Sequence, residues 1–270
     1  MVIVCENYAK DHGLQFSTDS DPKKCKTKCL AFLKRPRKIP SIKLCGNSLP
    51  WVSSGKHLGN LIENKIDGLK QDLKVKRAQY IARNNILYQE FSFCHPHTRF
   101  HLNFVYNSSF TGSALWNLFS RESEMLENSW NTSFRIMFGL SLTTHRYFVE
   151  PVSGKIHLKS MLMKRFLSFL DQIEKSKKVL PKKILKLVKK DARSTTGANL
   201  RKMMLLLDKV QVEDITKKDV DNFKYAEVPP NEAWKVGIVK EIIDVRNGSL
   251  EVENFVDEEL NEILEYVCTS

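Results

Sequence analysis

The chain reads FSTDSDPKKCKTKCLAFL at residues 16–33, LCGNSLPWV at 44–52 and KHLG at 56–59. Within the first of these stretches, residues 26–32 alternate and then turn apolar, as a strand leaving a basic surface would. The second stretch has apolar residues on both sides of a Gly-Asn turn signal at 46–47, which predicts a hairpin. A small antiparallel β element is therefore expected at the amino-terminal end.

Charge is distributed unevenly along the 270 residues, whose formal net charge is +12. Residues 23–43 carry nine Lys or Arg and no acid, which suits a surface that contacts phosphate groups or a solvated basic loop. Residues 155–190 carry twelve Lys or Arg against two acids, whereas 251–265 carry seven acids and no base. The acidic end is expected either to fold back on the basic block or to form a solvated helix face.

After residue 59 the apolar spacing is helical. Between 100 and 119 the aromatic residues Tyr106 and Phe110, with Leu115 and Trp116, are expected to form core. A short helix after Thr143 is expected to end at Pro151. Longer helices are predicted at 61–86, 124–138 with Gly139 as the stop, 156–173, 179–188, 200–210, 231–245 and 256–266. The helix at 200–210 is nearly all apolar and is therefore expected to be buried. The predicted fold class is mainly α with a small antiparallel β remnant at the amino-terminal end, which is α+β.

Several motifs, taken in order, resemble one protein family. They are Lys26-Thr27-Lys28-Cys29, Leu44-Cys45-Gly46 through Pro50-Trp51-Val52, Lys56-His57-Leu58-Gly59, Tyr106-Asn107-Ser108 with Gly112-Ser113-Ala114-Leu115-Trp116, and Thr144-His145-Arg146. Their order and spacing resemble the end of the palm, the thumb and the post-thumb region of the reverse transcriptases of non-LTR retrotransposons. The resemblance implies a truncated polymerase palm edge, then a helical thumb and a helical carboxy-terminal region.

The resemblance also implies a division of the chain and a set of site residues. The expected parts are a palm-end and primer-grip-like β remnant at 1–59, thumb-like and connecting helices at 60–150, a basic helical domain at 151–227, and carboxy-terminal helices with an acidic tail at 228–270. Primer-grip-like residues are Gly46, Pro50, Trp51, Leu58 and Gly59. The residues expected to bind nucleic acid are Lys26, Lys28, Arg35, Arg37 and Lys38 at the palm edge, and Lys70, Lys74, Arg77 and Arg83 on the thumb helix. Without the resemblance, the 61–86 segment would read as an ordinary amphipathic helix with a basic exposed face.

The chain departs from the family at the catalytic centre. Family members polymerise DNA with two metal ions held by aspartates, including a Tyr-x-Asp-Asp hairpin, and two such cations need several carboxylates. This sequence contains no Asp-Asp pair. We therefore expect no catalytic residue and no polymerase activity from this chain alone, and magnesium only in a full-length family member. His145 has no nucleophile beside it in the sequence and is expected to be structural or to face RNA.

The expected partner is RNA, DNA or an RNA–DNA hybrid, bound through backbone charge and duplex shape. Three alternatives stay open: a polymerase that borrows its aspartates from another chain, a protein-interaction module whose 155–190 block docks an acidic partner, and a retroelement relic that is never translated. The sequence has no phosphate-binding Gly-rich loop, so a nucleotide-hydrolysing fold is not expected. No small-molecule substrate is expected for this chain.

No signal peptide or membrane span is visible, so we expect an intracellular chain, in the cytoplasm or nucleus, whose cysteines are free thiols. Cys94-His95-Pro96-His97 has metal-capable side chains but lacks the second pair that a zinc site needs. The sequence leaves the oligomeric state open.

Overall fold

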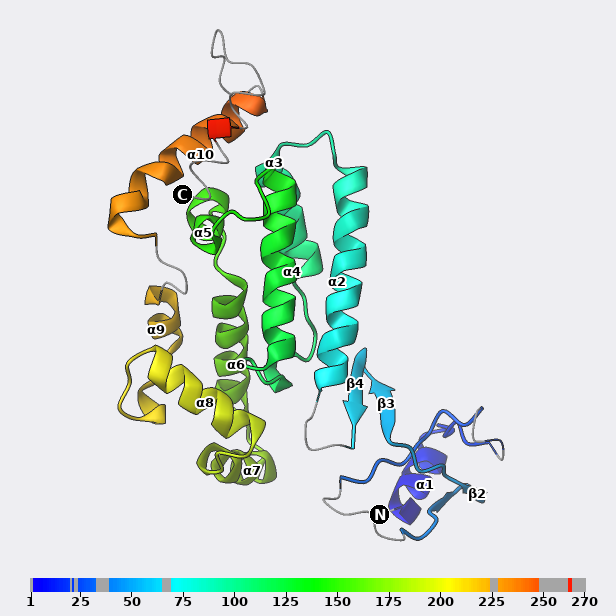
Figure 1. Cartoon of the computed structure of the whole chain (residues 1–270). Helices are drawn as coiled ribbons and strands as arrows, with labels where there is room; N and C mark the ends of the chain where they lie inside the picture. Colours follow the sequence, from blue (N-terminus) through cyan, green and yellow to red (C-terminus); the bar gives the residue numbers. More distant parts are fainter. Residues whose placement is uncertain are drawn as a thin grey trace. The chain divides into compact units, whose positions relative to one another are not determined.

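A computed structural model describes residues 2–19, 21, 24–32, 39–64, 69–223, 228–247 and 262–263 (Figure 1). The chain divides into two compact units, Met1–Asp72 and Leu73–Ser270. Most of the described residues are helical, and two small antiparallel sheets lie near the amino-terminal end. The predicted fold class, mainly α with a small β remnant, is confirmed at this level.

The first unit begins with helix α1 (Val2–Asp11) and a two-stranded sheet of β1 (Lys43–Leu44) and β2 (Asn47–Ser48). Cys45 and Gly46 form the turn between these strands, with φ of 49° and 78°. Positive φ at both central residues is typical of type I′ turns, whose backbone twist matches that of the two flanking strands of a hairpin. The predicted hairpin is therefore present, with its turn one residue earlier than predicted. A small core of Cys25, Leu44 and Leu49 lies beneath it.

A second hairpin, which the sequence did not predict, follows at β3 (Ser54–His57) and β4 (Asn60–Glu63). Its turn is Leu58-Gly59, again with positive φ at both residues, 47° and 80°. The predicted helix at 61–86 was wrong at its start, because residues 61–63 pair with β3. Helix α2 runs from Lys70 to Glu90.

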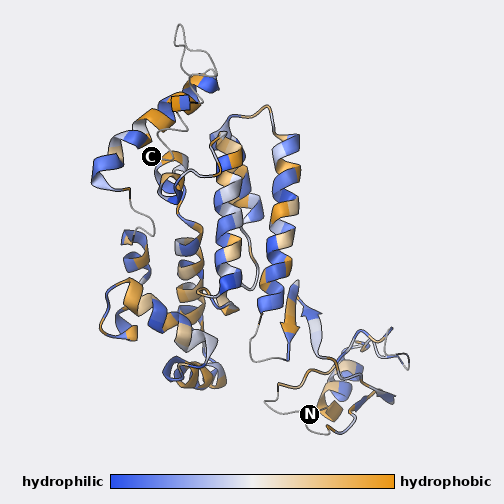
Figure 2. Cartoon of the chain, in the orientation of Figure 1, coloured by the Kyte–Doolittle hydropathy of each residue, from blue (hydrophilic) through white to orange (hydrophobic). Residues whose placement is uncertain are grey.

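The second unit is built on aromatic packing between α2, α4 (Arg121–Phe138) and α3 (Pro96–Leu102). Trp130 of α4 is fully buried, with Tyr80 of α2 stacked on it at 5.6 Å between ring centroids and Phe100 of α3 edge-on at 5.7 Å. Burial raises the pKa of Tyr80 to about 12. Figure 2 shows hydrophilic and hydrophobic residues interleaved along α2 and α4, as expected for helices that bury one face.

The remaining elements of this unit are short helical turns and further helices (Figure 1). They are the π-helix η1 (Asn103–Asn107), the 3₁₀ turns η2 (Ser113–Leu115), η3 (Arg146–Phe148), η4 (Val212–Asp214) and η5 (Pro230–Glu232), and the helices α5 (Val149–Ser153), α6 (Leu158–Lys175), α7 (Val179–Lys190), α8 (Thr195–Leu206), α9 (Lys217–Asn222) and α10 (Ala233–Arg246). Helix α6 contacts α4, α7 and α9, and α7 contacts α8. In the described part of the chain, no helix combines the length and the apolar character that crossing a membrane requires.

Three expectations about this unit were wrong in detail. Pro151 lies inside α5 instead of ending it. The N–H that proline lacks falls in the first turn of the helix, where backbone N–H groups have no intrahelical acceptor, so no hydrogen bond is lost. Tyr106 and Leu115 are 68% and 51% exposed and do not belong to the core, whereas Phe110 and Trp116 do. The segment 200–210 is not buried throughout: α8 ends at 206, and only one face of it is covered. Of the predicted helix 256–266, all but 262–263 lies outside the described residues.

Candidate nucleic-acid interface

Two of the predicted palm-edge lysines, Lys26 and Lys28, lie on an extended segment that pairs with the predicted primer-grip residues. The Cys29 N–H donates to Pro50 O at 3.0 Å, and the Val52 N–H donates to Cys29 O at 2.9 Å. These two bonds form a single parallel bridge between Cys29 and Trp51, not the longer strand that residues 26–32 predicted. Lys28 is thereby fixed beside the 50–52 segment, and its side chain remains exposed.

Hairpin β3–β4 forms the other wall of a groove in the same unit. The groove has a volume of about 590 Å³, and its basic lining residues are Lys26, Lys28, Lys56 and His57. Phe32, 68% exposed, adds an aromatic ring to the lining. The described residues that line this groove include no Asp or Glu, so its electrostatic character is that of an anion-binding surface.

Close packing holds the two walls together. A Cβ built on Gly55 of β3 would lie 3.2 Å from Leu30 Cδ1, closer than ordinary van der Waals contact. In the lining of the groove, the Cys25 thiol donates to Thr27 O at 3.0 Å. Burial, with a smaller contribution from Cys25, raises the pKa of the Cys29 thiol. Cys29 therefore acts as a neutral packing group, and the lysines supply the charge of the groove.

The primer-grip-like residues divide between structural and exposed positions. Gly46 and Gly59 hold the positive φ positions of the two hairpin turns. Trp51 is partly exposed, and its indole Nε1 donates to Pro40 O at 3.2 Å. Leu58 is 80% exposed at the tip of β3–β4, and Pro50 supplies the carbonyl that pairs with Cys29.

Helix α2 separates the four predicted thumb residues into two groups. Lys70, Lys74 and Arg77 are spaced four and three residues apart, so they share one side of the helix. Arg77 is half-buried, and its Nε donates to Ser129 Oγ of α4 at 2.8 Å, which fixes this side chain. Arg83 lies nine residues after Lys74, about two and a half turns, and therefore on the opposite side.

Arg83 instead shares a small pocket with Lys76, which is not among the residues predicted to bind nucleic acid. The seven-residue spacing of these two bases was a signal that could have found the pair, because it places both on one helix face. The other residues missed were Lys56 and His57, which the structure brings beside Lys26 and Lys28. Arg35, Arg37 and Lys38 lie outside the described residues.

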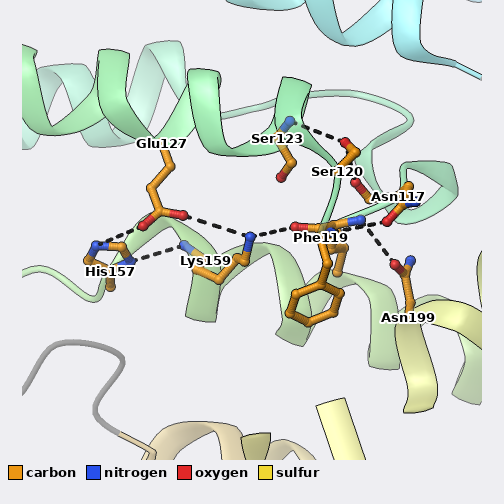
Figure 3. Close-up of polar contacts among 9 residues, drawn as sticks. Asn117, Phe119, Ser120, Ser123, Glu127, His157, Lys159 and Asn199 are labelled. Atoms are coloured by element: carbon orange, nitrogen blue, oxygen red, sulfur yellow. Dashed lines mark hydrogen bonds and ion pairs between the residues drawn. The ribbon is translucent and has the colours of Figure 1, made fainter. Parts of the chain in front are cut away.

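A second polar cluster lies inside the helical unit. Figure 3 shows Glu127 of α4 facing His157 and Lys159 at the start of α6. Glu127 Oε1 is 3.7 Å from His157 Nε2, and Glu127 Oε2 is 3.7 Å from Lys159 Nζ. Lys159 Nζ also donates to Leu118 O and lies 4.9 Å from the ring centre of Phe119. This cluster ties α6 to α4 and to the loop at 116–119.

Burial determines the protonation of this cluster. The Lys159 N–H donates to His157 Nδ1 at 3.4 Å, so the proton of the neutral imidazole is on Nε2. Burial is the main cause that lowers the pKa of His157, to about 4. Burial also raises the pKa of Glu127 and lowers that of Lys159. All three residues are 2–5% exposed, so a substrate in solution does not reach them, and the cluster is structural.

Asn199 of α8 completes the polar interior next to the cluster (Figure 3). Its Oδ1 accepts from the Leu118 N–H at 3.0 Å, and its Nδ2 donates to Trp116 O at 2.8 Å. One buried side chain thus satisfies two backbone groups about 80 residues away along the chain.

The other chemistry that the sequence allowed is not assembled in the described residues. His145 stacks on Tyr147 at 5.0 Å. His95 and His97 stack on each other at 5.3 Å, and no group of three His, Cys, Asp or Glu side chains is placed to hold a metal ion in this part of the chain. Comparisons with protein-family models, curated proteins and solved structures found no match to this chain.

Proposed function

We propose that this chain binds nucleic acid through its backbone charge and acts as the palm-end, thumb and post-thumb part of a retroelement reverse transcriptase, without catalysis of its own. The observation that carries the proposal is the basic groove, in which Lys26 and Lys28 meet Lys56 and His57 with no carboxylate among the described lining residues. The preferred partner is an RNA–DNA hybrid duplex or single-stranded RNA, recognised by charge and shape.

Helix α2 supports the same proposal with a second basic surface. Lys70, Lys74 and Arg77 lie along one side of the helix, and Arg77 is held in place by Ser129. Cations on a rigid helix contact phosphates at a lower entropic cost than cations on a mobile loop. The five described cysteines that are free thiols fit a reducing, intracellular setting.

The test is a salt titration of the purified chain against an RNA–DNA hybrid, with and without magnesium. If the three groove lysines each contact one phosphate, the K26Q/K28Q/K56Q variant lowers the slope of log K against log salt by about 3. A matched control neutralises three exposed lysines of α8 and α9 in the K202Q/K217Q/K218Q variant, and it is expected to leave the slope nearly unchanged. If both variants lower the salt slope equally, the chain binds nucleic acid no more specifically than any basic protein, and the proposal is wrong.

A second candidate, docking of an acidic protein, rests on helix α7. Leu180, Ile184 and Leu187 are 67%, 50% and 70% exposed and follow one another at four- and three-residue spacing, among the lysines of the 155–190 block. A Glu-rich amphipathic peptide is the matching probe. Binding of that peptide that is lost in an L180Q/L187Q variant, together with absence of duplex binding in the wild type, would favour this candidate over the first.

A further inference from the structure

A small pocket lies between helix α2 and the loop that follows π-helix η1. Its volume is about 100 Å³, and its polar lining includes Lys76, Gln79 and Arg83 of α2 with Asn107, Ser109 and Thr111 of the loop. Pockets for drug-sized molecules start at about 300 Å³. The cavity is therefore too small for a nucleoside and matches a single tetrahedral anion.

The charge of the pocket has one sign. Lys76 and Arg83 are two helical turns apart on the same face of α2, and the described residues that line the pocket include no carboxylate. Two cationic side chains in the lining of one pocket favour the binding of an anion there. Hydroxyl and amide side chains from Ser109, Thr111 and Gln79 add hydrogen-bond donors for the oxygens of such an anion.

The structure holds the loop of this pocket in place from behind. Arg165 of α6 donates through Nη1 to the carbonyl oxygens of Ser108 and Ser109, the latter at 2.9 Å. Carbonyl oxygens repel an anion, and both are engaged by a cation. Asn107 is fixed in turn, because its Nδ2 donates to Asn103 Oδ1 at 2.9 Å.

The floor of the pocket is equally rigid. The Tyr80 hydroxyl, at the centre of the α2 face, accepts from Asn103 Nδ2 at 2.9 Å. The loop residue Phe110 has φ of 36°, a conformation uncommon for a non-glycine residue. Its ring is buried against Trp116 at 5.9 Å between centroids, which holds that backbone conformation. The loop backbone from Asn107 to Phe110 is therefore held in place, which favours a selective site.

We propose that the pocket of Lys76, Arg83, Ser109 and Thr111 binds one phosphate group of the nucleic acid. This inference rests on the proposed function and adds a specific anchoring point to it. A backbone phosphodiester and a terminal phosphate monoester share the chemistry, and the experiment separates them.

The first measurement is a titration of the wild-type chain with inorganic phosphate at constant ionic strength, followed by backbone amide NMR. We expect saturable shifts confined to the loop at 107–111 and to the neighbouring turn of α2, and their loss in K76Q/R83Q. A second variant, S109D, places a carboxylate in the pocket without changing the helix, and it is expected to abolish the same shifts. Shifts that are absent, or that persist in both variants, would overturn the phosphate site whatever the result with nucleic acid.

The second measurement uses the RNA–DNA hybrid and distinguishes this inference from the proposed function. K76Q/R83Q is expected to lower the salt slope by about 0.9, the value for one phosphate. R121Q/K202Q, a matched pair of exposed cations elsewhere, is the control. If the wild type binds the hybrid and the two variants lose affinity equally, the pocket lies off the nucleic-acid path and this inference fails alone. If the wild type does not bind, the proposed function fails, and the phosphate titration still decides whether the pocket binds anions.

The source of the phosphate is decided by competition between 5′-phosphorylated and 5′-hydroxyl strands of the same sequence. Preference for the phosphorylated strand that disappears in S109D assigns the pocket to a chain terminus. Equal competition by both strands, weakened equally in S109D, assigns it to the backbone.

Discussion

His157 predicts a pH window in which the helical unit gains stability. Its imidazole is 2% exposed, and burial, with the nearby charges of Arg146 and Lys159, lowers its pKa from 6.5 to about 4. Between pH 4 and pH 6.5 the unfolded chain therefore carries a proton on this ring and the folded chain does not. Stability therefore rises with pH across this window and is lost as pH falls through it.

The size of the effect follows from the shift. A difference of about 2.5 pKa units corresponds to about 3 kcal/mol at 1.36 kcal/mol per unit. Glu127 has the opposite effect on the pH dependence of stability. Its pKa is raised above the ordinary 4.5, so the folded state retains a proton on this carboxyl at pH values just above 4.5, where the unfolded chain has lost it. Hydrogen bonds from Lys209 and Thr216 lower the pKa of Asp219. Asp219 therefore changes the stability only at pH values below its ordinary pKa of 3.8, outside the window of His157.

A His157→Asn variant isolates the imidazole. Asn is a favourable N-cap residue and keeps an acceptor for the Lys159 N–H at the start of α6. We expect the free energy of unfolding of this variant to rise by about 3 kcal/mol less than that of the wild type between pH 4 and 6.5. Urea denaturation followed by tryptophan fluorescence measures it, since Trp116 and Trp130 are fully buried in this unit. Parallel pH profiles for variant and wild type, or an imidazole NMR signal that titrates near 6.5, would refute the reasoning.

Three further substitutions test the interior of the helical unit by urea denaturation. Asn199→Ala leaves the Leu118 N–H and Trp116 O without partners, and we expect a loss of about 3 kcal/mol; a loss below 1 kcal/mol, roughly the value of one ordinary hydrogen bond, would contradict this account. Gly197→Ala places a Cβ 2.2 Å from a backbone oxygen of the preceding loop, so we expect a loss of about 1–3 kcal/mol, while wild-type stability would show that the loop yields freely. Lys159→Met leaves the buried carboxylate of Glu127 without its cationic partner, and we expect a loss of about 3–5 kcal/mol in the free energy of unfolding. The E127Q/K159M double variant is expected to recover most of this loss. Additive losses in the single and double variants would show that the two groups do not interact.

Helix α4 illustrates how much of this fold the sequence predicts. Its apolar stripe and Gly139 predicted a helix at 124–138, and α4 runs from Arg121 to Phe138. Ser120 caps its start by accepting from the Ser123 N–H, and Gly139 ends it with φ of 65°. Helices α6 and α7 were predicted within two residues at each end for the same reason, since an amphipathic stripe bounded by cap and stop residues is a local signal.

The error at 61–86 shows where local signals fail. Leu61 and Ile62 fit the helical spacing, yet they pair with Lys56 and Gly55 in hairpin β3–β4. The turn that brings them there uses Leu58 in a positive φ conformation, which is uncommon for Leu and which no turn propensity predicts. Cross-strand pairing decided the conformation of these residues, and propensity did not.

The candidate site was predicted in its residue types but not in its grouping. Lys28 and Lys56 are brought to one groove by two backbone hydrogen bonds between residue 29 and residues 50 and 52. Arg83 was grouped with Lys74, although their spacing places them on opposite sides of α2. Helical arithmetic available from the sequence would have corrected the second grouping, whereas the first required the fold.

Helix α6 connects the buried polar cluster to the candidate phosphate pocket. Lys159 near its start holds Leu118 O, and Arg165, six residues later, holds Ser108 and Ser109 O. The loop at 108–118 is therefore attached to one helix at both of its ends, through charged donors to carbonyl oxygens. Because charge-assisted hydrogen bonds are about twice as strong as neutral ones, this attachment keeps the loop rigid without regular secondary structure along most of it. The buried cluster around Glu127 then has a role beyond stability, since it holds the helix from which the pocket loop is positioned.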